Sequence, residues 1–150
     1  MEYRKAVFGD VETIYDIVKG YADSGDMLVR SRNTLYETLR DMIVAVDGGK
    51  VVGVGGLHMM WDRMAEVRTM AVSPDHVRQG VGANIVRRLL DEGRMLGVEK
   101  FFTLTYKPGF FATLGFEIVS KDDLPHKVWK ECIDCPKFPN CDEIAMIYPV

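Results

Sequence analysis

The segment that contributes most to the fold prediction is Val77-Arg-Gln-Gly80-Val-Gly82-Ala-Asn-Ile-Val-Arg-Arg-Leu-Leu90. It opens with two glycines and continues as an amphipathic helix, whose apolar positions follow the helical period until a terminating Gly97. Strand-like residues precede it at 65–72 and follow it at 98–105. In this order of elements, backbone N–H groups and a helix dipole can bind phosphate oxygens. The segment therefore predicts a phosphate-binding turn between a strand and a helix.

The residues after Gly82 exclude two familiar nucleotide sites. A mononucleotide P-loop requires lysine followed by serine or threonine, whereas Ala83 and Asn84 stand here. A dinucleotide fingerprint requires a third glycine or alanine where the chain has Ile85. A pyrophosphate group on the turn remains a good fit. The alternative is that the glycines only tighten a connection between strand and helix.

The N-terminal residues predict one strand and two helices. Residues 2–7 are typical of a short strand, and Asp10 is expected to cap a helix that ends before Gly25. Asn33 is expected to cap a second helix with Leu35, Leu39 and Met42 turned inward. Residues 23–31, between the two helices, lack periodicity and are a candidate ligand loop.

Three β-rich runs follow these helices. Ile43–Val46 and Val51–Met60 are separated by Asp47-Gly48-Gly49-Lys50, which predicts a hairpin. A third strand is predicted over 65–72, ended by Ser73-Pro74. Strict alternation along this strand would place one set of side chains on a single face, namely Glu66, Arg68, Met70 and Val72.

The composition is typical of one globular domain over residues 1–150. A formal net charge of −3 provides no broad basic surface for nucleic acid or anionic lipid. The charged N-terminus is unlike a secretion signal, and no apolar run is long enough to span a bilayer. Three cysteines are too few and too clustered for a disulfide framework. We therefore expect a cytoplasmic protein with neither a nucleic acid nor a membrane as its partner.

The chain resembles the GCN5-related N-acetyltransferases (GNAT). Their acetyl-CoA motif, Arg/Gln-x-x-Gly-x-Gly/Ala, is matched at Gly80 and Gly82, although Val77 replaces its first residue. The resemblance extends to Ala71-Val72-Ser-Pro-Asp75 and to Phe110-Phe-Ala-Thr-Leu-Gly115-Phe116.

More narrowly, the chain is similar to the short N-acetylglutamate synthases of arginine biosynthesis. This similarity is carried by Met27-Leu-Val-Arg30-Ser31, by Ala65-Glu-Val-Arg68 and by Phe102-Thr-Leu-Thr-Tyr106. It continues in the tail, at Leu124-Pro-His-Lys127-Val-Trp129 and at the cysteines before Ala145.

The resemblance implies an α/β (α+β) fold with flanking helices and a mixed central sheet that splays between its fourth and fifth strands. It implies acetyl-CoA as co-substrate, with its pantetheine along the strand edge and its pyrophosphate on the turn. The implied CoA-binding residues are Ala71, Val72, Gln79, Gly80, Val81, Gly82, Ala83 and Phe111. The Val72 N–H would also stabilise the oxyanion that develops on the thioester.

The resemblance also indicates candidates for proton transfer. Glu66, on the strand that lines the implied cleft, is the candidate base, with a solvated carboxylate or an ion-pair partner as the alternative. The family often protonates the leaving thiolate with a tyrosine where this chain has Phe111. Tyr106 could substitute, or it could complete the core while solvent supplies the proton. The general acid is therefore unassigned.

A glutamate substrate carries two carboxylates, which require separate cationic groups. Arg30, Arg68 and Lys127 match family positions that could bind them, and Lys107 is a fallback on a loop. The alternative for each is a surface cation or a local salt bridge.

The cysteines suggest a second, less favoured kind of site. Cys132, Cys135 and Cys141, with His126, could supply four zinc ligands, but the spacing lacks a second paired motif. We expect reduced thiols and no metal.

The leading prediction is therefore direct transfer of acetyl from acetyl-CoA to the α-amine of L-glutamate. The alternatives are acetylation of another amino acid or small amine, a CoA-binding regulatory domain without turnover, and an interaction surface built on a metal-bound cysteine tail. A homodimer is expected only by analogy with relatives.

Overall fold

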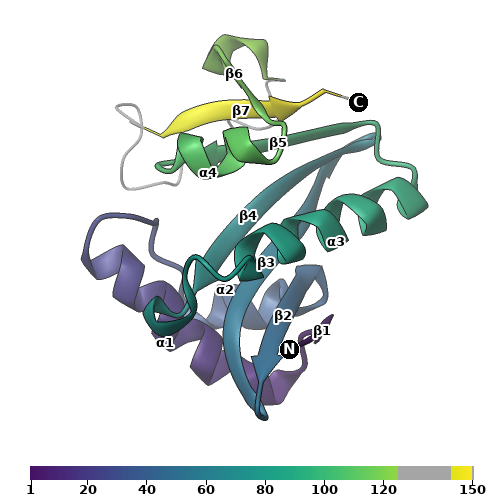
Figure 1. Ribbon diagram of the computed structural model, residues 1–150. Coiled ribbons are helices and arrows are strands. Elements are labelled where there is room, and N and C mark those ends of the chain that lie inside the picture. The colour runs from purple at the N-terminus through teal and green to yellow at the C-terminus, as the bar shows by residue number, and fades with distance from the viewer. Residues whose placement is uncertain (125–142, 150) are drawn as a thin grey trace.

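A seven-stranded sheet with the order β1-β2-β3-β4-β5-β7-β6 forms the centre of the protein (Figure 1). The computed structural model describes residues 1–124 and 143–149. The strands are β1 (Glu2–Lys5), β2 (Met42–Asp47), β3 (Lys50–Trp61), β4 (Met64–Val72), β5 (Lys100–Thr105), β6 (Glu117–Val119) and β7 (Ile144–Tyr148). The α-helices are α1 (Val11–Asp23), α2 (Arg32–Glu37), α3 (Val81–Leu96) and α4 (Pro108–Thr113). Short 3-10 helices are η1 (Phe8–Asp10), η2 (Leu39–Asp41), η3 (Pro74–His76) and η4 (Lys121–Asp123).

The sheet splays between β4 and β5, as the family resemblance implied. These two strands are parallel and all other pairs are antiparallel. Pairing between them covers only Met64–Glu66 on β4 and Lys100–Phe102 on β5, although both strands continue. Figure 1 shows β1–β4 and β5–β7 diverging from this point as two arms.

Helices cover the two faces of the sheet and divide the core. On one face, α3 packs Ile85 and Leu89 against inward residues of the sheet such as Leu57 and Val67. On the other face, α1 and α2 pack Ile14, Val18 and Leu35 against a second cluster that includes Val44 and Val54. All of these side chains are buried. Burial of apolar surface on both faces therefore fixes β4 in the middle of the molecule.

Two predicted helix starts are corrected by hydrogen bonds near the N-terminus. The cap of α2 is Ser31, whose hydroxyl accepts from the Thr34 N–H, and not the predicted Asn33. Asp10 does precede α1, but its carboxylate accepts from the Val7 N–H and from Arg4, with no cap bond to the helix. Asn33 instead lies inside α2, where its side-chain amide donates to Glu37 at 3.0 Å.

Met42 also differs from its predicted position. It begins β2 and does not extend the second helix, since α2 ends at Glu37. Met42 is nevertheless buried beside α1 and α2, so its apolar character predicted burial correctly and the element wrongly.

The predicted alternation along β4 is wrong beyond Arg68 because the strand contains a β-bulge. Gly56 pairs with Arg68 and Val54 with Ala71, so Thr69 and Met70 together lie opposite the single residue between them on β3. Thr69 adopts a left-handed φ of 59°.

The bulge switches the faces of the sheet to which the side chains of β4 point. Val67 packs with the α3 cluster, so its neighbours Glu66 and Arg68 point to the α1 and α2 face. After the bulge, Met70 and Val72 pack against the α3 cluster, and Ala71 lies in the other cluster. The four side chains predicted to share one face are therefore divided between two.

Candidate active site

A cleft of about 1710 Å³ opens where β4 and β5 separate. Its walls come from both arms of the sheet, from the loop after α1, from the turn before α3 and from the loop between β5 and α4. Most of the predicted site residues line it, namely Arg30, Glu66, Arg68, Ala71, Val72, Gly80, Val81, Gly82, Ala83, Tyr106 and Phe111. The splay thus brings together residues that are widely separated in the sequence.

The turn before α3 has the backbone geometry that an anion site requires. Gly80 precedes the first residue of α3 with a left-handed φ of 78° and makes no side-chain cap bond. The first N–H groups of a helix have no partner within it, so they are available to a phosphate in the cleft. A Cβ on Gly82 would lie 3.0 Å from the Phe110 ring, so a larger residue here would require that ring to shift by a few tenths of an ångström.

Gln79 does not line the cleft. Its side-chain amide donates to the Asp75 carbonyl at 3.5 Å on the exposed side of the turn. Any contact between Gln79 and a ligand would therefore involve its backbone.

The end of β4 presents backbone groups of Val72 to the cleft. The Tyr21 hydroxyl donates to the Val72 carbonyl at 2.6 Å, whereas the next N–H, that of Ser73, pairs back to β3. Because the N–H and C=O of one strand residue point to the same side, the Val72 N–H also faces away from β3. Burial raises the pKa of the Tyr21 phenol, which keeps the hydroxyl protonated as a donor.

Glu66 and Arg68 form an ion pair at the deepest point of the splay. The Arg68 Nη1 lies 3.6 Å from the Glu66 Oε1, and the two side chains are only 11% and 9% exposed. Glu66 is also the last residue of β4 that pairs with β5. A buried carboxylate beside a largely buried guanidinium can hold both a cationic and an anionic group of a ligand.

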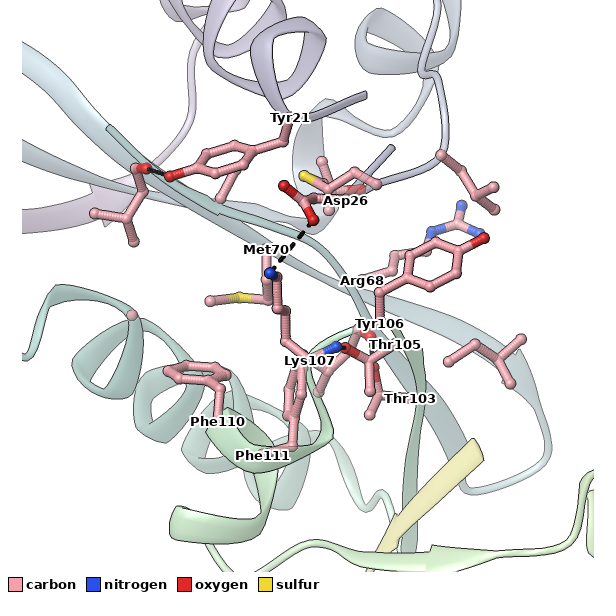
Figure 2. Close-up of a pocket in the computed structure, with 18 of the residues that line it drawn as sticks. Tyr21, Asp26, Arg68, Met70, Thr103, Thr105, Tyr106, Lys107, Phe110 and Phe111 are labelled. Carbon is pink, nitrogen blue, oxygen red and sulfur yellow. Dashed lines mark hydrogen bonds and ion pairs between the residues drawn. The ribbon is translucent and has the colours of Figure 1, made fainter. Parts of the chain in front are cut away.

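Tyr106 and Phe111, the two aromatic residues weighed for proton transfer, have different environments. Tyr106 is partly buried, and Figure 2 shows its side chain projecting into the same part of the cleft as that of Arg68. Phe111 is buried in the core, with its ring centroid 5.2 Å from that of Phe116. Phe111 thus forms part of the wall between the cleft and the core.

The structure also reveals an ion pair that sequence reasoning missed, although Lys107 is the predicted fallback ligand and Asp26 lies in the candidate ligand loop 23–31. Figure 2 shows an ion pair from Lys107, on the loop after β5, to Asp26, on the loop after α1. The two charged groups are 3.3 Å apart. The Ser24 hydroxyl and then Lys107 hold the pKa of Asp26 below its usual range. Their sequence positions gave no signal for this contact between the two arms.

Other sequence predictions fall outside the described residues. These are the carboxylate ligand Lys127 and the zinc candidates His126, Cys132, Cys135 and Cys141. Within residues 1–124 and 143–149, no group of three His, Cys, Asp or Glu side chains is arranged to hold a metal ion. Nor does this part of the chain contain a helix that is both long and apolar enough to cross a membrane.

Comparison with known proteins gives consistent matches over most of the chain. The model of the Acetyltransferase (GNAT) family matches residues 11–116. A protein of Chlorobaculum tepidum, named an uncharacterized N-acetyltransferase, is 36% identical over 144 residues, covering 96% of this chain and 93% of that protein. An amino-acid acetyltransferase of Mycobacterium tuberculosis is 37% identical over 131 residues, covering 85% of this chain and 75% of that protein.

A solved structure extends the similarity to the whole fold and to the co-substrate. A protein from Mycobacterium tuberculosis, crystallised in complex with CoA, superimposes with a TM-score of 0.87 at 31% identity, covering 100% of this chain and 99% of that one. The splayed sheet and the glycine turn of the present chain provide the cleft and the backbone donors that such a ligand needs. The chain therefore belongs to the acetyltransferase (GNAT) family and is an acetyl-CoA-dependent N-acetyltransferase.

Proposed function

We propose that the protein transfers the acetyl group of acetyl-CoA to the α-amine of L-glutamate. The observation that carries this proposal is the buried pair of Glu66 and Arg68, 3.6 Å apart in the cleft. An α-amino acid presents an ammonium group and a carboxylate side by side, and this pair offers a complementary charge to each. The name of the Mycobacterium tuberculosis relative, amino-acid acetyltransferase, supports the same substrate class.

The glutamate side chain requires a second cationic group. Arg30 lines the cleft on the α1 and α2 side, and Lys107 lines it on the opposite arm. Either could bind the second carboxylate while Arg68 binds the first. Lys127 stays a prediction, since it lies outside the described residues.

Binding of acetyl-CoA is assigned to backbone groups of this chain. The N–H groups of residues 79–83 would hold the diphosphate, and the edge of β4 at Ala71 and Val72 would pair with the pantetheine. Acetyl-CoA supplies the thioester, whose carbonyl oxygen would accept from the Val72 N–H as negative charge develops. The Tyr21 hydroxyl fixes this backbone through the Val72 carbonyl.

Proton transfer is assigned to groups on the two arms. Glu66 would remove a proton from the ammonium group, directly or through a water, because only the free amine attacks. Tyr106, after β5, would return a proton to the departing thiolate. Alignment of the amine with the thioester would contribute much of the remaining rate enhancement.

The proposed pathway, location and oligomeric state follow from the proposed substrate. N-acetylglutamate formation begins arginine biosynthesis in the synthases that this chain resembles, so we propose the same pathway, a cytoplasmic location and a homodimer.

The test is an acceptor panel in which thiol release from acetyl-CoA is followed for each amino acid in turn. We expect L-glutamate to have the highest kcat/KM, ahead of L-glutamine, L-aspartate and glycine. Arg68→Gln should raise the KM for glutamate at least tenfold, as on the order of 1.4 kcal/mol is lost with the charged contact, and should leave the KM for acetyl-CoA unchanged. The proposal fails if glutamate ranks no higher than the other amino acids.

A further inference from the structure

His58 on β3 is the direct cross-strand neighbour of Glu66 on β4. Residues paired in this way carry their Cβ atoms about 4.5–5.5 Å apart on the same face of the sheet. The next pair on that face is Gly56 and Arg68. Because Gly56 has no Cβ, no side chain of β3 stands next to His58 at the position opposite Arg68. His58 also lines the cleft.

Asp41 connects His58 to the outside of the cleft. It is the last residue of η2, and its Oδ2 lies 2.6 Å from the His58 Nδ1. Both side chains are 27% exposed, whereas the Glu66 side chain is 9% exposed. Among the described residues, His58 belongs to the cleft wall and Asp41 does not. The series Glu66, His58, Asp41 therefore leads from a buried carboxylate to the protein surface.

Acetyl transfer to an ammonium group releases a proton that must leave the cleft. The substrate nitrogen begins with three protons and ends, after the N–C bond forms and the C–S bond breaks, with one. One of the two lost protons joins the thiolate, and the other passes to solvent. If Glu66 takes this second proton, it must give it up before the next turnover, and its own exposure to water is small.

We propose that His58, oriented by Asp41, is the proton relay that returns Glu66 to its ionised form. This inference rests on the proposed role of Glu66 as the base. An imidazole can accept and release a proton near neutral pH. Because Nδ1 contacts Asp41, proton exchange with Glu66 would use the other ring nitrogen, Nε2, directly or through a water. Asp41 stabilises the charged imidazolium while the proton is in transit.

The charged groups that the structure places beside His58 come from two elements. Asp41 belongs to η2, and Glu66 and Arg68 belong to β4.

The experiment compares the full-length wild type with His58→Gln and Asp41→Asn, using whichever amine the wild type acetylates best. For His58→Gln we expect kcat at pH 7 to fall on the order of tenfold or more, with unchanged KM for both substrates. The loss should shrink toward pH 9, where more of the amine is already deprotonated. Added imidazole should restore kcat in proportion to its concentration, and Asp41→Asn should show a smaller loss.

His76→Gln provides the matched control, because His76 is a second histidine paired with an aspartate, Asp47, at 3.1 Å. It lies before α3 and is not a neighbour of Glu66 in the sheet, so imidazole should not increase its kcat. The relay is refuted if His58→Gln keeps the wild-type kcat, if its main effect is a higher KM for the amine, or if imidazole fails to restore it. Glutamate specificity fails separately, through the wild-type ranking of acceptors.

Discussion

Glu66 has a buried side chain and a cationic neighbour, Arg68. This environment determines how its carboxylate can bind a ligand or exchange a proton. Sequence reasoning placed it beside Arg68 on one strand face, and the 3.6 Å contact confirms that these two belong together. The same reasoning missed Tyr21 and His58, because their partners, the Val72 carbonyl and Asp41, are distant in the sequence. A tyrosine at a helical period predicts burial, and nothing local predicts where its hydroxyl will point.

Replacing Glu66 by Gln should lower kcat about 100-fold at pH 7, because the amide keeps the shape but cannot accept the proton. The defect should be greatest at low pH, where the amine is most fully protonated, and should diminish as pH rises. A pH–rate profile measures this, with Glu12→Gln, a surface carboxylate on α1, as control. An unchanged profile would remove Glu66 as the base.

Gly80→Ala should weaken CoA binding about fivefold to thirtyfold, because a side chain makes the left-handed conformation unfavourable by about 1–2 kcal/mol and the turn relaxes away from it. Gly97, at the other end of α3, is a matched control with a φ of 91°. Gly97→Ala should reduce stability with no change in CoA affinity. Calorimetric titration of both variants distinguishes the effects, and equal affinities for the two would contradict the prediction.

At the scale of whole elements, periodicity predicted α1, α3 and the hairpin of β2 and β3 but could not predict the bulge in β4. One extra residue at Thr69 and Met70 changes which face each later side chain occupies. A period of two contains no information about where a strand gains a residue. The side chains of Met70 and Val72 therefore lie on the opposite face of the sheet from the one that alternation alone predicted.

The junction of β1 and α1 provides a prediction about pH. The Arg4 guanidinium, foremost, and the Val7 N–H hold the pKa of Asp10 below its ordinary 3.8. A carboxyl group whose pKa is lower in the folded than in the unfolded chain stabilises the fold at pH values above its unfolded-state pKa. This stabilisation is lost as the pH falls through its folded-state pKa.

Asp10→Asn should therefore lower the free energy of unfolding by about 1–2 kcal/mol at pH 7, and this difference should shrink below pH values of about 4. Urea unfolding at both pH values measures it. A difference that is the same at pH 3 and pH 7 would show that the charge contributes nothing.

For the molecule as a whole, the family resemblance predicted the splayed mixed sheet, and the structure and the comparisons confirm it. Composition and hydrophobic periodicity alone do not predict the splay, because the sequences of β4 and β5 are typical of ordinary strands along their full length. The point where they part depends on long-range packing of the two arms against different helices.

Because the walls of the cleft come from both arms, CoA bound there should stabilise the folded chain and leave the unfolded chain unaffected. At about 100 times its Kd the expected gain is about 2.7 kcal/mol, visible as a higher Tm in thermal unfolding. Adenosine is the control, since it lacks the diphosphate and the pantetheine. A Tm that responds equally to both ligands would contradict binding through the turn at residues 79–83.

Among residues 1–124 and 143–149, no strand pairs with β4 on its β5 side beyond Glu66, and an open strand edge of this kind can recruit a strand from a neighbouring molecule. Two hydroxyl groups block both ends of this edge. Thr103 donates to the Val67 carbonyl at 2.8 Å, and Tyr21 occupies the Val72 carbonyl. An intruding segment therefore cannot complete a hydrogen-bond ladder, so the opening that admits a cofactor is at the same time protected against aggregation.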